Sequence, residues 1–156
     1  MRLLGGLALA LLCLASLAGA SSAEVDRFGG AIASLGYAVK SDRASGPTAW
    51  ESAQFDLRRK RELTIKATQP FPRDPHTFYR FTVTEERYAD AAAAQARLAR
   101  LREEPPGLLP EDRKAFPLRD GFRRGETVYV VATDVYLFEQ TELPNFMAKL
   151  KAALAR

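Results

Sequence analysis

Any chemistry that needs an imidazole must use His76, because the 156 residues contain one histidine. Asp74 lies two residues before it, in a segment with three prolines. A protein metal site needs three or four ligands, often several of them His or Cys, and this pair falls short of that set. A serine hydrolase would need a serine beside His76 in space, and the sequence has no Gly-x-Ser-x-Gly motif. We therefore expect a solvated loop histidine, and we assign no metal site and no catalytic residue.

The sequence also contains no specific evidence for a glycosidase-type carboxylate pair or for a glycine-rich phosphate-binding loop. With 19 acidic residues in the chain, such pairs arise by chance, and we expect most of them to be surface charges. The clustered glycines, Gly29-Gly30 and those between Gly121 and Gly125, match neither nucleotide-binding pattern. The sequence therefore favours no cofactor. The acidic residues from which a pair could be drawn are Glu51, Asp56, Glu62, Asp134, Glu139 and Glu142.

The basic run at 58–61 is the densest charge feature of the chain, and a second, shorter run follows at 123–124. The isolated Arg73 and Arg119 could also lie near the first run. We expect the first run at the tip of a β-hairpin and the second at a turn, where loop tips at one end of a sheet would bring them together. Such a patch could hold the phosphate groups of anionic lipid or polysaccharide, or an acidic partner, through bidentate arginine contacts. The competing interpretation is a solvated tip that binds nothing. The candidate anion-binding residues are Arg58, Arg59, Lys60, Arg61, Arg123 and Arg124.

Aromatic side chains supply one further candidate surface. Most of them fall at inward-facing spacing along predicted strands, which indicates core positions. Tyr136 and Phe138 differ, because they follow an apolar strand and precede the last predicted helix. We expect these two residues to form an exposed apolar contact surface.

The start of the chain has the anatomy of a cleavable secretion signal. Arg2 is followed by an apolar run over residues 3–17 and then by small residues. Signal peptidase selects small side chains at the last and third-last positions before the cut, which favours cleavage after Ala20 or Ala23. Residues 1–23 are thus predicted to be removed, leaving the mature chain in the periplasm or outside the cell.

Two alternatives for this segment remain open. An uncleaved anchor is one, because the apolar run approaches the roughly 20 residues that span a bilayer. A lipoprotein is the other, although Leu12 stands where the lipobox before Cys13 requires a small residue. Cys13 is the only cysteine, so cleavage would leave a domain without a thiol or a disulfide. Loss of Arg2 would lower the formal net charge of +4 by one, which is too small an excess to indicate nucleic-acid binding.

Residues 24–156 are predicted to fold as one domain whose elements alternate between helical and strand patterns. Apolar residues at helical spacing indicate a first helix over 25–35, and Gly36 is suited to end it. Asp90 can cap an alanine-rich helix, and Pro144 suits the first turn of a final helix. The segment 127–133 is apolar on both faces, as in a strand covered on both sides. The other predicted strands are the two within 48–68, which flank the tip at 58–61, and those at 78–84 and 116–122.

This order of elements predicts an α+β fold. We expect an antiparallel or mixed sheet of about five strands, with about three helices packed mainly on one face. The absence of a catalytic motif favours an exported, non-enzymatic binding module, whose partner would be another exported protein or an anionic envelope surface. The alternatives are an envelope-associated protein that binds anionic lipid or polysaccharide through the basic tip, and a small hydrolase that uses His76.

Overall fold

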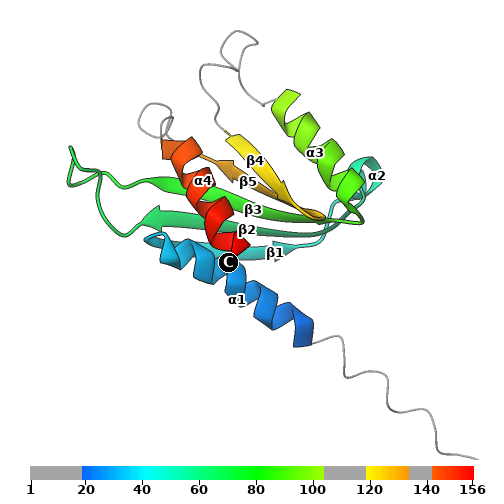
Figure 1. Ribbon diagram of the computed structural model, residues 1–156, viewed down its shortest axis with the longest axis horizontal. Coiled ribbons are helices and arrows are strands. Elements are labelled where there is room, and N and C mark those ends of the chain that lie inside the picture. Colours follow the sequence, from blue (N-terminus) through cyan, green and yellow to red (C-terminus); the bar gives the residue numbers. More distant parts are fainter. Residues whose placement is uncertain (1–18, 104–118, 134–141) are drawn as a thin grey trace, which may run out of the picture.

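Nine helices and strands make up the described part of the chain. The computed structural model describes residues 19–103, 119–133 and 142–156. The predicted fold class is confirmed, because five antiparallel strands and four helices form one small α+β domain. The elements (Figure 1) are α1 (Gly19–Ser34), β1 (Tyr37–Ser45), α2 (Ala49–Phe55), β2 (Leu57–Ala67), β3 (Arg80–Tyr88), α3 (Ala91–Glu103), β4 (Arg119–Arg124), β5 (Thr127–Ala132) and α4 (Glu142–Ala155).

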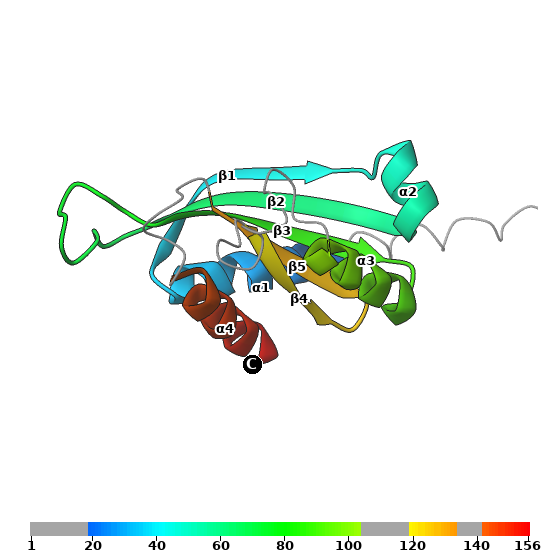
Figure 2. The same cartoon turned by 90° about the horizontal axis from the view of Figure 1, so that it is seen from above.

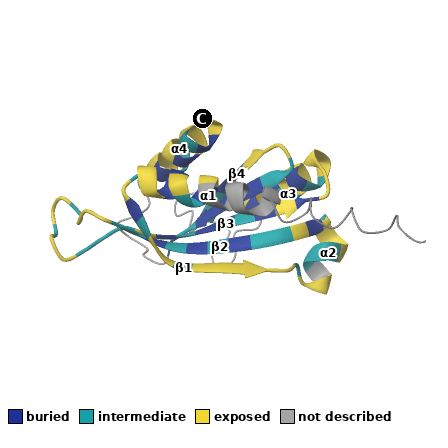
Figure 3. Ribbon diagram, turned by 90° about the horizontal axis from the view of Figure 1, so that it is seen from below, coloured by how far each residue is buried: buried dark blue, intermediate teal, exposed yellow. Residues whose placement is uncertain are grey.

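The strands form one sheet in the order β1-β2-β3-β5-β4, and every neighbouring pair is antiparallel. Strand β5 lies inside the sheet, and four consecutive residues from Val128 to Val131 are buried. The prediction of a strand covered on both sides is therefore confirmed for β5. Strand β1 is at one edge, and Figure 3 shows that it is exposed along most of its length, whereas most residues of β2 and β3 are buried or intermediate.

The helices are divided between the two faces of the sheet instead of lying mainly on one. Because side chains alternate along a strand, Ile65, Val83 and Val131 pack in one cluster with α1 and α4. Tyr88, Val128 and Val130 pack on the other face, in a cluster with α3. Phe28 and Phe146 belong to the first cluster, in which the ring of Phe146 stacks on Phe81 with 4.7 Å between centroids. Leu98 and Leu101 of α3 belong to the second cluster, which Phe55 of α2 also joins.

Gly121 allows α3 to lie close against β4. A Cβ atom at this position would stand 2.7 Å from the carbonyl oxygen of Tyr129 and 2.9 Å from Cδ2 of Leu101. Both distances are shorter than ordinary van der Waals contact, so only a glycine fits without moving the helix or the strand. The small alanine Ala94, which is fully buried, contributes to the same close packing.

The hairpin predicted around residues 58–61 is wrong. Residues 49–55 form helix α2 instead of a strand, because Thr48 and Glu51 make a capping box in which each side chain accepts a hydrogen bond from the other's backbone N–H. The whole basic run from 58 to 61 then lies within β2, paired with β1 on one side and β3 on the other. The segment 37–45, for which the sequence patterns predict no strand, is strand β1.

Residues 68–79 form an arm that extends beyond the sheet between β2 and β3, as Figures 1 and 2 show. Two successive turns shape it, because the N–H of Asp74 donates to the carbonyl of Phe71 and that of Thr77 donates to the carbonyl of Asp74. The Asp74 carboxylate accepts hydrogen bonds from the Thr77 hydroxyl and from the backbone N–H of His76. These bonds hold the pKa of Asp74 below its ordinary value.

Candidate functional site

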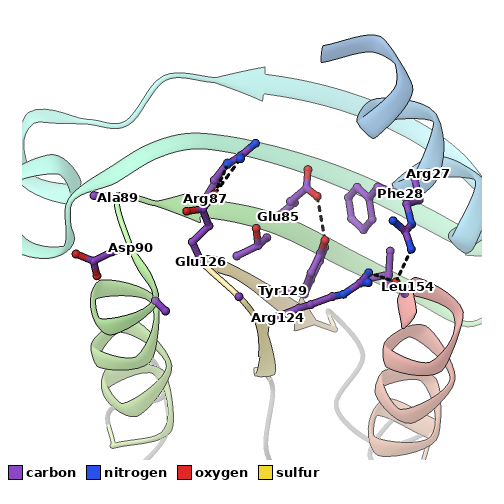
Figure 4. A pocket seen from close by; sticks show the side chains of 13 residues that line it. Arg27, Phe28, Glu85, Arg87, Ala89, Asp90, Arg124, Glu126, Tyr129 and Leu154 are labelled. Atoms are coloured by element: carbon purple, nitrogen blue, oxygen red, sulfur yellow. Dashed lines mark hydrogen bonds and ion pairs between the residues drawn. The ribbon is translucent and has the colours of Figure 1, made fainter. Parts of the chain in front are cut away.

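A cleft of about 600 Å³ opens on the face of the sheet that α1 and α4 cover. Its walls come from α1, from the C-terminal end of α4, from the β4–β5 turn and from the start of α3, and its floor is formed by β3 and β5 (Figure 4). We call it the arginine cleft. Its lining residues are Arg27, Phe28, Glu85, Arg87, Ala89, Asp90, Ala91, Arg124, Gly125, Glu126, Thr127, Tyr129 and Leu154.

Tyr129 and Glu85 occupy the middle of the cleft floor. They face each other across the β3–β5 pair, and the phenol of Tyr129 donates to Oε1 of Glu85 over 3.2 Å. The Tyr129 ring packs between Phe122 and Phe28, with centroid distances of 5.2 Å and 5.6 Å. The packed ring fixes the position of a polar tip at the bottom of the cleft.

Arg27 and Arg124 converge at the α4 end of the cleft. Arg27 comes from α1 and Arg124 from the last position of β4, and both guanidinium groups donate to the backbone carbonyl of Leu154. This carbonyl is one of the last in α4, which have no partner within the helix. Figure 4 shows the two side chains reaching the same point from different elements.

The opposite end of the cleft is acidic and is also held in place. Nε and Nη2 of Arg87 both donate to Oε1 of Glu126, over 3.0 Å and 2.8 Å. Asp90 precedes α3, and its carboxylate accepts a hydrogen bond from the N–H of Ala93 over 2.8 Å. A carboxylate here also interacts favourably with the positive end of the helix dipole.

An ion pair between the buried Arg61 and the half-exposed Asp42 supports the floor from the β1 side. Nε and Nη2 of Arg61 donate to the two carboxylate oxygens of Asp42, over 2.9 Å and 2.7 Å, and the guanidinium lies over the ring of Phe28. The hydrogen bond from Arg61 holds the pKa of Asp42 below its ordinary value, and the same bond raises the pKa of Arg61. The negative charge of Glu85 raises the pKa of Arg61 further, so these two groups compensate each other electrostatically.

A second polar cluster lies on the other face of the sheet, beneath α3. Glu86, which is 4% exposed, accepts hydrogen bonds from the Tyr88 phenol and from Arg97. Burial and the negative charge of Glu86 raise the pKa of Tyr88 above its ordinary value. Because all three groups lie between α3 and the sheet, this cluster fixes the position of the helix and is not open to a ligand in the way that the cleft is.

The structure separates most of the basic residues that the sequence singled out. Lys60 bonds Glu51 of α2 over 3.1 Å, and the exposed Arg58 lies 3.9 Å from Asp56. Arg61 is committed to Asp42. A single basic hairpin tip is therefore absent, because strand alternation and neighbouring carboxylates assign these side chains to different places.

Strand alternation also separates the two arginines of the second run. Arg123 points to the α3 face, where it donates to Gln95 and to the carbonyl of Gly125, whereas Arg124 lines the cleft. Arg59 is on the same face as Arg124 and lines a small hollow beside the cleft. Of the six predicted residues, Arg124 alone lines the cleft, while the predicted contact residues Tyr136 and Phe138 lie outside the described part of the chain.

Arg27 was missed as a site residue by sequence reasoning, as were Arg87 and the Tyr129–Glu85 pair. Arg27 precedes the buried Phe28 in the helical stripe of α1. Its position at the edge of the buried face could have identified it as a site residue. Glu85 and Arg87 lie beyond the end of the strand predicted at 78–84 and continue the alternation of Phe81 and Val83 on one face of β3. The partners of these residues depend on sheet register, which no local pattern specifies.

His76 lies exposed in the arm, remote in the fold from the cleft-lining residues. No hydrogen bond or ion pair of its imidazole to another described side chain is found. Within residues 19–103, 119–133 and 142–156, no cluster of three or more His, Cys, Asp or Glu side chains is arranged to hold a metal ion.

Comparisons with known proteins do not extend this assignment. No protein-family model, curated protein or solved structure matches the chain. None of the helices in the described ranges has the length and apolar character needed to cross a membrane. The functional argument therefore rests on the geometry of the cleft.

Proposed function

We propose that this chain is an exported, non-enzymatic binding module that takes its ligand in the arginine cleft. The observation that carries the proposal is the cleft itself, in which residues from α1, β3, the β4–β5 hairpin and α4 converge on about 600 Å³ of open space. Ligand sites in proteins are concave, have volumes of roughly 300–1,000 Å³ and contain a few well-placed polar groups. The arginine cleft has each of these properties.

The polar groups of the cleft are arranged for recognition. Tyr129 is fixed by its bond to Glu85, Arg87 by its bonds to Glu126, and Asp90 by the N-terminus of α3. Groups held in this way lose little conformational freedom when a ligand binds, which favours affinity. Three carboxylates in the lining, those of Glu85, Asp90 and Glu126, have the chemistry of a general base, but each is already engaged in a hydrogen bond or an ion pair. This engagement favours binding over catalysis.

Export is the second part of the proposal and rests on the N-terminal sequence. The predicted cuts after Ala20 and Ala23 fall in the first turns of α1, before Arg27 and Phe28. Cleavage at either place would leave the helical residues that line the cleft and enter the core. Mass spectrometry of the chain recovered from an expressing bacterium should show loss of residues 1–20 or 1–23, and an intact N-terminus would contradict this part of the proposal.

The alternative of envelope binding through the basic run has less support. Lys60 and Arg61 are each committed to a carboxylate, and no hairpin presents the run to a membrane. The cleft is a better candidate, because its groups converge on one open volume.

A cleft-filling variant tests the proposed function. Ala91 is an exposed residue that lines the cleft, whereas its neighbour Ala92 is exposed outside it. We expect small molecules that co-purify with the wild-type full chain, identified by mass spectrometry, to be lost from Ala91→Trp and retained by Ala92→Trp. Added extract from the source compartment serves as the ligand supply. If the two tryptophan variants and the wild type retain the same molecules, the cleft is not the binding site.

A further inference from the structure

The three carboxylates that line the arginine cleft all have partners. Glu126 is bonded by Arg87, Asp90 accepts a backbone N–H at the start of α3, and Glu85 is compensated by Tyr129 and by the nearby charge of Arg61. The lining contains three arginines and three carboxylates, but their charges are distributed unevenly along the cleft. Among the side chains that the structure describes, the positive charge without a carboxylate partner lies at the α4 end.

Arg27 and Arg124 supply this uncompensated charge. In the part of the chain whose side chains the structure describes, neither guanidinium pairs with a carboxylate, and both bond the neutral carbonyl of Leu154. The negative end of a helix dipole amounts to only about half an elementary charge, which offsets a fraction of two full charges. Each guanidinium carries five N–H donors, so one bond to a carbonyl leaves most of them available.

We propose that the arginine cleft binds a phosphate monoester, with the phosphate group held between Arg27 and Arg124. A phosphate monoester carries close to two negative charges at neutral pH and several acceptor oxygens, which matches two converging guanidinium groups in charge and in number of donors. A neutral or cationic group would leave the charge of both arginines unbalanced. This inference rests on the proposed function, because it assigns a ligand class to the same cleft.

The rest of the cleft fits the body of such a ligand. The volume of about 600 Å³ is much larger than one phosphate group, so a further part of the ligand must extend toward the β4–β5 turn. The surface there presents the hydroxyl of Thr127, the Arg87–Glu126 pair and the Asp90 carboxylate, all of which form hydrogen bonds. A hydroxylated and otherwise uncharged body, as in a phosphorylated sugar or polyol, would satisfy these groups.

Calorimetric titration of the full chain, purified in mild detergent, tests this assignment at one fixed ionic strength. The ligands are glucose 6-phosphate, inorganic phosphate and glucose. We expect saturable binding of the ester, weaker binding of inorganic phosphate and no binding of glucose. Arg27→Gln and Arg124→Gln should each weaken ester binding by about tenfold or more, since each removes charge-assisted hydrogen bonds to the phosphate.

Arg123→Gln is the matched control for Arg124→Gln. It removes the same charge one residue earlier in β4, but from the opposite face of the sheet. Its ester affinity should stay within about twofold of wild type, because a distant surface charge is screened by salt. Arg124→Lys keeps the charge and loses the planar fork, so it should give an intermediate affinity, and it replaces Arg124→Gln if that variant fails to fold.

Three results would overturn the assignment. The first is the absence of saturable binding of both glucose 6-phosphate and inorganic phosphate. The second is an equal loss of ester affinity in Arg123→Gln and Arg124→Gln. The third is binding of glucose as tight as that of the ester. Failure of this inference is distinguishable from failure of the proposed function. A ligand without phosphate that is lost in Ala91→Trp would keep the binding module and reject the phosphate site, whereas a ligand unaffected by Ala91→Trp would reject both.

Discussion

Replacing Asp42 by asparagine tests whether Arg61 is a structural residue and not a ligand-binding one. The side chain of Arg61 is 7% exposed, and its guanidinium bonds both oxygens of Asp42, whose side chain is 46% exposed. Asp42→Asn removes the negative charge and one of the two acceptor oxygens while it keeps the size of the side chain. Arg61 would then remain beneath the cleft with Glu85 as its remaining negative neighbour.

The expected cost follows from the two charge-assisted bonds. A hydrogen bond to a charged group contributes about 1.5–3 kcal/mol, and removal of one partner of a fully buried ion pair costs roughly 3–5 kcal/mol. Asp42 is half exposed, so water screens the pair, and asparagine retains one acceptor. Both effects lower the estimate to about 2 kcal/mol of unfolding free energy, which is a substantial part of the roughly 5–15 kcal/mol that stabilises a domain.

Urea unfolding at neutral pH and at acidic pH measures this cost. With a slope of roughly 1–3 kcal/mol per molar urea, the midpoint should fall by about 1 M at neutral pH. The lowered pKa of Asp42 means that its contribution is fully present above its ordinary pKa of 3.8 and is lost as pH falls through the lower value of the folded state. The difference between wild type and Asp42→Asn should therefore shrink as the pH falls below about 4.

The same substitution in an Arg61→Met background provides the control. With no guanidinium to pair, Asp42→Asn should cost less than about 0.5 kcal/mol. An equal cost in the two backgrounds, or a cost that does not change between neutral and acidic pH, would refute the account of this pair.

Two further stability predictions concern the face that α3 covers. Gly121→Ala should destabilise the fold by about 1–3 kcal/mol, because its Cβ would stand 2.7 Å from the carbonyl oxygen of Tyr129, and a urea midpoint equal to that of wild type would contradict the close packing of α3. Glu86→Gln should cost about 2–4 kcal/mol by leaving the largely buried Arg97 without its counter-charge, and a loss below about 1 kcal/mol in the same assay would show that the pair is not a main stabiliser.

Elements with strong local signals could be predicted from the sequence, and those defined by long-range pairing could not. The alanine run predicts α3, and the carboxylate of Asp90 does bond the N–H of Ala93 at its start. Strand β1 has no alternating apolar pattern, because an exposed edge strand buries little and is held by its pairing with β2. Helix α2 did have a local signal in its capping box, Thr48 with Glu51, which outweighs the strand-like spacing of its apolar residues.

The candidate site was predictable only in part, for a similar reason. Arg124 was recognised as a possible anion ligand, but its expected companions at 58–61 belong to an interior strand and are divided between its two faces. Its actual companion is Arg27 of α1, near the other end of the chain, and the two meet because α1 and α4 pack on the same face. Patterns within short segments contain no information about such a meeting.

The most direct test of the central claim is the NMR response of arginine side chains to inorganic phosphate. In the full chain labelled with nitrogen-15, the Nε–Hε resonances of Arg27 and Arg124 should shift together and saturate with one dissociation constant, while that of Arg123 stays in place. Shifts that rise without saturation over all surface arginines, or that leave Arg27 and Arg124 unchanged, would contradict the assignment of the arginine cleft as the binding site.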